Sequence, residues 1–153
     1  MKRFKFSLDA PLRVKQKIEQ IREQQLIEAR MELEREKKEL RVLEEKKGNI
    51  KSSLEQKVKE SLKVAELAFF EALINTVNSK LKNQERKVAG AFERCKEAME
   101  VYIISRRERQ VIEKLKEKRF NAYLSELNRE EQKILDDIAS LAFLRRGEGE
   151  YAP

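Results

Sequence analysis

The feature of this sequence that most restricts its fold is the scarcity of residues that end helices. Pro occurs only at positions 11 and 153, and Gly only at 48, 90, 147 and 149. Pro removes a backbone donor and Gly raises the entropic cost of ordering, so these two residues are the usual breaks in a helix. Because nothing forces a stop between Pro11 and Arg146, the sequence predicts helix over almost its whole length.

The ends of this helical span carry recognisable signals. Pro11 suits the first turn of a helix, and Ser7 or Asp9 before it can cap the free amides, so helix one is predicted to begin near residue 10. The Gly and Pro residues of 147–153 are those that usually follow a helix, and a frayed tail is expected there.

Apolar side chains recur at alternating intervals of three and four residues, which is typical of a coiled-coil seam. The first such seam consists of Leu26, Ala29, Leu33, Glu36, Leu40, Leu43, Lys47, Ile50 and Leu54, with Glu36 and Lys47 as polar interruptions. The second consists of Phe120, Leu124, Leu127, Glu131, Ile134, Ile138 and Leu141. From Ile50 to Leu62 the intervals become four, which breaks the register as a stutter or a turn does.

The composition agrees with a thin seam and not with a large core. Charged residues make up 41% of the chain, against about 25% in an average globular domain. Apolar residues still make up 40%, which is too many for a disordered polyelectrolyte. The length of 153 residues fits one domain.

A hairpin would halve the length of a continuous helix, which at about 135 residues would extend for about 200 Å. Two stretches could hold the turn: Gly48–Ser61, and Asn75–Asn83 with its Asn and Ser residues. Antiparallel pairing about either stretch sets apolar residues against apolar residues, so the pattern alone does not choose between them.

Missing residue types exclude several kinds of chemistry. The chain has no His, which removes His-dependent acid–base catalysis, His-assisted nucleophiles and His-ligated metals, so a non-enzymatic protein without metal or cofactor is predicted. The single Cys95 is expected to be a small buried residue, in a reducing compartment. No apolar run has the length of a transmembrane helix or of a signal peptide, which predicts a cytoplasmic protein.

The net charge of +7 is unevenly distributed along the chain. Residues 101–120 carry seven basic and three acidic residues, whereas residues 130–137 carry one basic and four acidic residues, so the predicted helices are banded. The densest basic cluster is Arg106, Arg107 and Arg109. It is open to three interpretations: a solvated helix face, a docking patch for an acidic protein surface, or a nucleic-acid contact, which the interspersed Glu residues disfavour.

Several motifs together resemble the flagellar FliJ family and its YscO-like counterparts in injectisomes. The motifs are Phe4-Lys5-Phe6, the heptads through Leu40, Leu43, Ile50 and Leu54, the pair Phe69-Phe70 before Leu73, the block 115–119, and Glu131-Gln132-Lys133-Ile134-Leu135-Asp136. The resemblance covers nearly the whole chain.

The resemblance implies an all-α, antiparallel two-helix coiled-coil hairpin, similar to the stalk of a rotary ATPase. It places helix one at about 10–56, the turn at about 57–61 and the longer helix two at about 62–146, within a single domain of residues 1–153. It also implies the partners: a hexameric export ATPase, the cytoplasmic domain of the export gate and export chaperones, at the inner face of the cell membrane. Neither nucleic-acid binding nor direct insertion into the membrane is expected.

Two sets of site residues are carried over by position from the family. The export-gate set lies on both helices beside the turn: Leu43, Lys46, Ile50, Phe69, Leu73, Thr76 and Lys80. The family often has Tyr where this chain has Lys46 and Ile50. The ATPase set lies at the open end of the hairpin: Leu8, Leu12, Leu124, Leu127, Ile134, Ile138 and Leu141.

In the register that the resemblance implies, much of the second seam outruns helix one, so its heptads are expected to find a partner. That partner is either an ATPase ring, as the resemblance implies, or another copy of the chain in a dimer or four-helix bundle. The alternative functions are therefore a structural homodimeric coiled coil and a basic helical nucleic-acid binder. Phe69 and Phe70 cannot both be buried in a two-stranded seam, so one of them is expected to be exposed.

Overall fold

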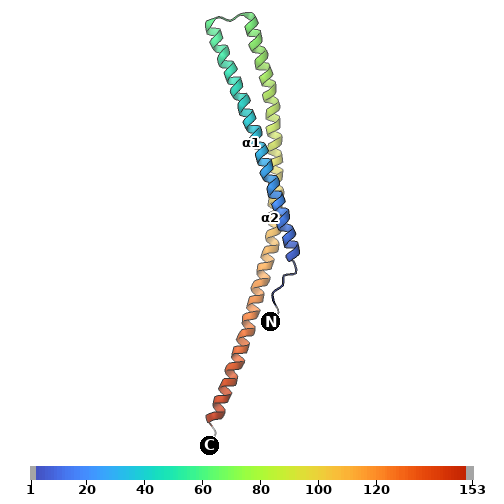
Figure 1. The fold of residues 1–153 in the computed structure, drawn as a ribbon, viewed down its shortest axis with the longest axis vertical. Helices are drawn as coiled ribbons and strands as arrows, with labels where there is room; N and C mark the ends of the chain where they lie inside the picture. Colours follow the sequence, from blue (N-terminus) through green and yellow to red (C-terminus); the bar gives the residue numbers. More distant parts are fainter. Residues whose placement is uncertain (1–2, 151–153) are drawn as a thin grey trace. The chain divides into compact units, whose positions relative to one another are not determined.

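The computed structural model describes residues 3–150, which form two long α-helices. Helix α1 spans Asp9–Glu60 and helix α2 spans Val64–Glu150, with residues 61–63 between them (Figure 1). No strand occurs within the described part of the chain. The expected all-α hairpin is confirmed, and α2, with 87 residues, is longer than α1, with 52, as predicted.

The helix ends differ from the predicted ones. Helix α1 begins at Asp9 and continues to Glu60, so the loop is residues 61–63 and not 57–61. The amide of Ser61 still donates to the carbonyl of Lys57, at 3.1 Å. Residues 49–63 contain neither Gly nor Pro, so no helix-breaking residue ends helix α1 earlier. Lys57 and Lys59 in its last turn interact favourably with the helix dipole and stabilise the carboxyl end of the helix.

At the carboxyl end, α2 continues to Glu150 where a frayed tail was predicted from residue 147. Gly147 and Gly149 both lie inside the helix and neither has a positive φ, so neither forms a helix-ending cap. Each Gly disfavours helix by only about 1 kcal/mol relative to Ala, which a long helix tolerates. The rest of the predicted tail, residues 151–153, lies outside the described residues.

The chain divides into two compact units where a single domain was expected. One unit is residues 17–106 and contains the loop. The other combines the amino-terminal residues up to Gln16 with the part of α2 from Arg107 onward. Each unit has its own buried residues and is described by itself below.

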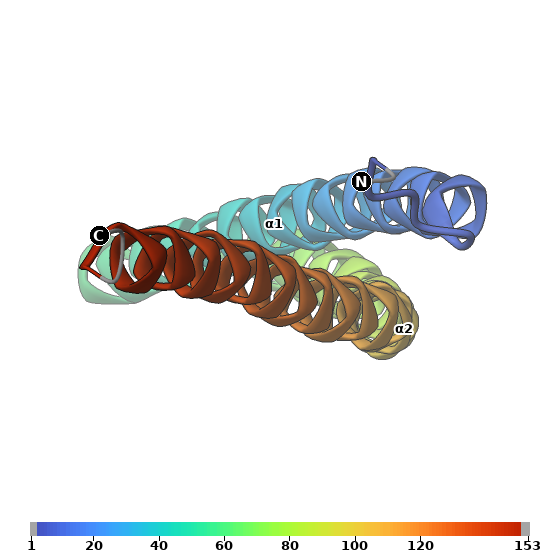
Figure 2. The ribbon, with the colours of Figure 1, turned by 90° about the horizontal axis from the view of Figure 1, so that it is seen from below.

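In the unit 17–106, the two helical segments run side by side in opposite directions (Figures 1 and 2). Every residue of the first predicted seam is buried or half-buried, and Leu26 and Leu33 are the most deeply buried of them on α1. Opposite them, Val77, Leu81 and Ala91 are buried on α2. The heptad pattern therefore predicted correctly which face of α1 is covered.

Contacts across this unit settle the position of the turn. Glu36 bonds Gln84, and Glu32 bonds Arg94, so the paired residues lie 48 and 62 positions apart with the loop 61–63 near the middle. The alternative turn at Asn75–Asn83 is wrong, because this stretch is helical and supplies buried seam residues. Its Asn and Ser side chains are exposed, and polar residues are tolerated at exposed positions of a helix.

In the other unit, residues 3–8 and the first turns of α1 pack against α2. Phe6 and Leu12 are 6% and 5% exposed, and they form the core of this unit. The ring of Phe4 lies edge-on to Phe120, with the centroids 5.2 Å apart, and 5.4 Å from Tyr123. These aromatic contacts hold the amino-terminal segment on α2 although it is not helical.

Polar contacts supplement this aromatic packing. Lys116 Nζ lies 2.8 Å from Asp9 Oδ1, and 5.8 Å from the centroid of the Phe6 ring. The guanidinium of Arg119 stacks over the same ring and donates to Ser7 Oγ at 3.1 Å. The basic residues of this band of α2 are thus used partly within the chain.

Candidate interaction surfaces

The loop end of the hairpin presents one aromatic ring to the solvent. Phe69 is 62% exposed, whereas Phe70 is half-buried, and their rings meet edge to face at 6.1 Å. One residue corresponds to about 100° of rotation around a helix, so only one of the two rings can face α1, and the burial identifies it as Phe70. Val64, at 86% exposed, and Leu67, at 46%, extend the apolar surface at the start of α2.

The remaining residues of the predicted gate set divide between the seam and the surface. Leu43, Ile50 and Leu73 are half-buried, because they occupy positions that face the opposite helix. Lys46, Thr76 and Lys80 are exposed. Together with Phe69, these three are the members of the set whose side chains a partner could reach without opening the hairpin.

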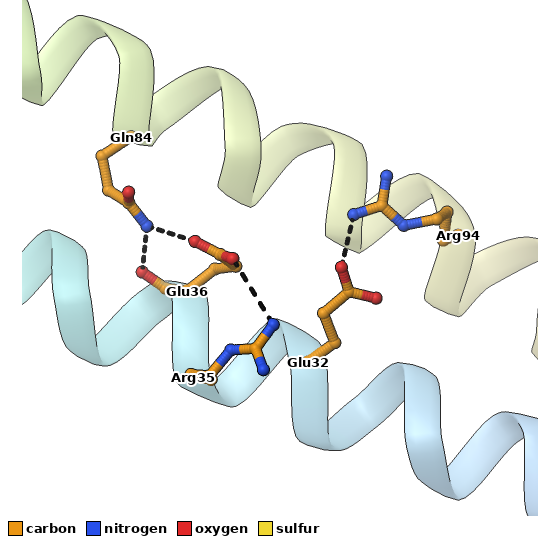
Figure 3. A network of polar contacts seen from close by, with 5 residues as sticks. All are labelled: Glu32, Arg35, Glu36, Gln84 and Arg94. Carbon is orange, nitrogen blue, oxygen red and sulfur yellow. Dashed lines mark hydrogen bonds and ion pairs between the residues drawn. The ribbon is translucent and has the colours of Figure 1, made fainter.

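A polar layer interrupts the seam of the same unit (Figure 3). Gln84 is only 5% exposed, and its Nε2 donates to the backbone carbonyl of Glu36 at 2.9 Å and to Oε2 of Glu36 at 2.5 Å. Arg35 lies 3.9 Å from the other carboxylate oxygen. The Glu36 side chain, which interrupts the apolar seam, therefore has a hydrogen-bond partner in Gln84. The sequence pattern did not predict this partner.

A surface ion pair flanks this layer on the edge of the hairpin. Arg94 donates to Glu32 at 2.8 Å, with both side chains more than a third exposed. Exposed pairs of this kind contribute little stability, typically about 0.2–1 kcal/mol. The buried Gln84–Glu36 contact is the more specific determinant of register, because any slip would leave its groups unpaired in the seam.

The predicted charged patch is only partly free for a partner. Arg106 and Arg107 are exposed, but Arg109 is half-buried and pairs with Glu113 one turn further along α2. Nearby, Lys15 bonds Glu108 at 2.7 Å. Of the predicted patch, Arg106 and Arg107 are therefore accessible, whereas Arg109 is engaged in a pair within its own unit.

Beyond the amino-terminal segment, α2 is exposed on all sides. Leu124 and Leu127 are 37% exposed and half-buried, respectively, and every residue from Asn128 to Gly149 is exposed. The predicted residues Ile134, Ile138 and Leu141 are 58–59% exposed and form an apolar stripe along this part of the helix. In Figure 1 no other segment of the unit runs beside it.

The amino-terminal members of the predicted ATPase set pack inside their own unit. Leu12 is buried against α2 and Leu8 is half-buried, so both pack the unit together and Leu12 offers no surface to a partner. The prediction missed Leu135, Phe143 and Leu144, which are 59%, 76% and 62% exposed. The sequence did contain a signal for these residues, because Leu135 adjoins the heptad residue Ile134, and Phe143 and Leu144 follow the heptad residue Leu141 within three positions.

Features of other protein classes are lacking in the described residues. Between residues 3 and 150 no group of three or more His, Cys, Asp or Glu side chains is placed to hold a metal ion. Neither helix, over its described length, has a stretch both long and apolar enough to cross a membrane. Cys95 is a half-buried free thiol rather than a fully buried residue.

The structure is a hairpin of two long helices with a hydrogen-bonded polar layer in its seam. Exposed apolar side chains lie near the loop and along the carboxyl-terminal part of α2. These features define a helical protein that acts by binding other proteins. The chain belongs to the FliJ family: the family model described as the flagellar FliJ protein matches residues 4–148. This family is a non-enzymatic part of the type III export apparatus, and the chain is accordingly a component of such an apparatus.

A solved structure shares the fold. The structure described as that of a YscO homologue, CT670 from Chlamydia trachomatis, superposes with a TM-score of 0.55 over 98% of this chain and 100% of that chain, at 21% sequence identity. The search of curated proteins found no match. The similarity to the solved structure supports the hairpin, and the family match supports the assignment to the export apparatus.

Proposed function

We propose that this chain is a stalk-like adaptor of a flagellar type III export apparatus, which inserts the carboxyl-terminal part of α2 into the ring of the export ATPase. The observation that carries this proposal is the stripe of Ile134, Ile138 and Leu141, which is 58–59% exposed and which no residue between 3 and 149 covers. A patch of this kind on a soluble helix is usually an interaction site. The acidic and basic residues around the stripe make the proposed contact partly polar, which favours reversible binding.

The loop end is proposed to contact the cytoplasmic domain of the export gate. Phe69 supports this, because a large exposed aromatic ring is a common anchor at interfaces. Lys46, Thr76 and Lys80 add polar groups at the surface, while Leu43, Ile50 and Leu73 hold the two helices in register. The accessible pair Arg106 and Arg107 is proposed as a docking patch for an acidic partner surface.

The proposal also covers location and further partners. The protein is proposed to work in the cytoplasm, peripherally at the inner face of the cell membrane, through its contacts with the ATPase and the gate. Export chaperones are proposed as additional partners, and the family resemblance is what supports them. The protein itself is proposed to catalyse no reaction.

The test is to add the purified protein to the cognate export ATPase and to measure hexamer formation and the rate of hydrolysis. The wild-type chain is expected to promote both. Ile138→Asp places a charge on the stripe and is expected to remove the effect, whereas Ser140→Asp, which adds the same charge on the opposite side of the helix, is the matched control. If the wild-type chain changes neither quantity, the proposal is wrong.

Gate binding requires a separate measurement with the isolated cytoplasmic domain of the gate. Phe69→Ala is expected to weaken the complex in titration calorimetry, while Phe92→Ala, which removes another exposed ring of α2 at 55% exposure, is expected not to. Equal affinities of the two variants would contradict the assignment of Phe69.

A further inference from the structure

The carboxyl-terminal part of α2 is a solitary helix with an unusual load of exposed apolar surface. Over residues 128–149 it exposes six large apolar side chains, namely Ile134, Leu135, Ile138, Leu141, Phe143 and Leu144. Helices of about 12–15 residues or fewer are marginal in water, and longer ones still derive most of their stability from packing. This segment therefore has a physical reason to pair with another helix even when no ATPase is present.

The face of this segment that carries Ile138 has opposite charges on its two sides. Glu131 precedes the apolar residues of this face and Arg145 follows them, whereas the basic residues Arg129 and Lys133 lie on the opposite side of the helix. A second copy aligned in parallel would set each of these charges against its own kind. An antiparallel second copy would set the Glu131 of each helix against the Arg145 of the other.

The spacing makes this complementarity specific. Glu131 and Arg145 each lie seven residues from Ile138, which is about two helical turns or about 10.5 Å on either side. Seven residues at 100° each bring both side chains to nearly the same face as Ile138. If two such helices pack antiparallel about Ile138, each Glu131 faces an Arg145 of the second copy.

The apolar residues fit the same arrangement. Leu135 and Leu141 lie three residues to either side of Ile138, so each stands opposite the other in the second copy. Ile134 stands opposite Ala142, which pairs a large side chain with a small one. The face that would be buried therefore contains apolar side chains in its centre and one ion pair at each end.

We propose that residues 128–149 of two copies of this chain pair in antiparallel orientation about Ile138, with two Glu131–Arg145 ion pairs fixing the register. This homodimer uses the face assigned above to the ATPase, so under the proposed function the two associations exclude each other. The dimer is a distinct inference because it can be measured without the ATPase.

Sedimentation equilibrium of the full 18.1 kDa chain tests the proposal. The wild-type protein is expected to show a mass that rises with concentration toward twice that of the monomer. Glu131→Arg and Arg145→Glu each convert two attractive pairs into repulsive ones, so each single variant is expected to weaken the dimer by roughly tenfold. High salt is expected to reduce the difference between variants and wild type.

Mixing the two single variants provides the decisive measurement. A chain with Arg at both positions and a chain with Glu at both positions regain both opposite-charge pairs, so the 1:1 mixture is expected to associate at least as tightly as wild type. E131R alone and R145E alone are the controls for the mixture, and each is expected to remain weakly associated. K133E, which carries the same charge change as R145E on the opposite side of the helix, keeps both ion pairs and is expected to associate like wild type.

Three outcomes would overturn the proposal. These are a wild-type chain that stays monomeric at concentrations of tens of micromolar, E131R and R145E variants that each associate like wild type, and a 1:1 mixture of E131R and R145E that associates no better than either variant alone. Circular dichroism of each variant establishes that the hairpin is folded, since residues 128–149 are exposed and contribute no buried residue to either unit.

Discussion

Removal of the buried glutamine in the polar layer should destabilise the hairpin, although the replacement is more apolar. In Gln84→Leu the Glu36 carboxylate, whose side chain is 13% exposed, loses the donor at 2.5 Å, and the adjacent carbonyl loses the donor at 2.9 Å. One bond to a charged group and one to a neutral group are together worth about 2–4 kcal/mol. The added apolar burial offsets about 1–2 kcal/mol of this.

The net expectation for Gln84→Leu is a loss of about 1–2 kcal/mol in the free energy of unfolding, measured by urea titration with ellipticity at 222 nm. Adding Glu36→Leu to it should recover most of the loss, because the carboxylate that Gln84 paired is then absent from the seam, while the carbonyl of residue 36 keeps its hydrogen bond within the helix. Arg86→Leu, at an exposed position of α2 nearby, is the matched control and should change stability by less than about 0.5 kcal/mol.

The reasoning is refuted by either of two results. One is a Gln84→Leu variant as stable as wild type, which would mean that the hydrogen bonds contribute nothing net. The other is a double variant no more stable than Gln84→Leu alone, which would mean that the cost does not arise from an unpaired Glu36.

Three further predictions follow from burial. Leu26→Ala should lower the free energy of unfolding by about 2–4 kcal/mol, whereas Ile27→Ala, at the adjacent position that is 42% exposed, should lower it by less than about 1 kcal/mol. Equal urea midpoints for the two variants would contradict the burial of Leu26 in the seam. Phe70→Ala should reduce the melting temperature, while Phe69→Ala should leave both it and the helicity unchanged; a large loss of ellipticity in Phe69→Ala would show that this ring packs in the seam. Phe6→Ala should detach the amino-terminal segment, so limited trypsin digestion followed by mass spectrometry should show faster cleavage within it than in wild type.

Much of the fold follows from local patterns. The scarcity of Gly and Pro indicates long helices. The 3-4 spacing predicts which face of α1 is covered, and it also predicts the polar interruption of that face at Glu36. The position of the turn does not follow from the pattern, since two registers pair apolar residues equally well. The helix ends were missed by a few residues because Gly147 weakens a helix without ending it, and because no breaker marks the loop 61–63.

The candidate surfaces were predictable only in part. In the register that the family resemblance implies, the second heptad seam extends beyond helix one, which predicts the exposed stripe of Ile134, Ile138 and Leu141. The exposure of one of two adjacent phenylalanines follows from helical geometry. Which phenylalanine is exposed could not be predicted, because that depends on the rotation of α2 about its axis when it packs on α1. The burial of Leu12 likewise depends on a non-helical segment that folds back onto α2.

By itself, the sequence determined that this chain is helical over almost its whole length, with apolar stripes and charges elsewhere, because helix propensity and periodicity are local properties of the chain. Only the tertiary structure decided that Gln84 satisfies Glu36, that Phe69 and not Phe70 is exposed, and that Leu12 is covered. Each of these is a contact between residues distant in sequence, and such contacts depend on the register and rotation of two packed helices, which no local pattern encodes.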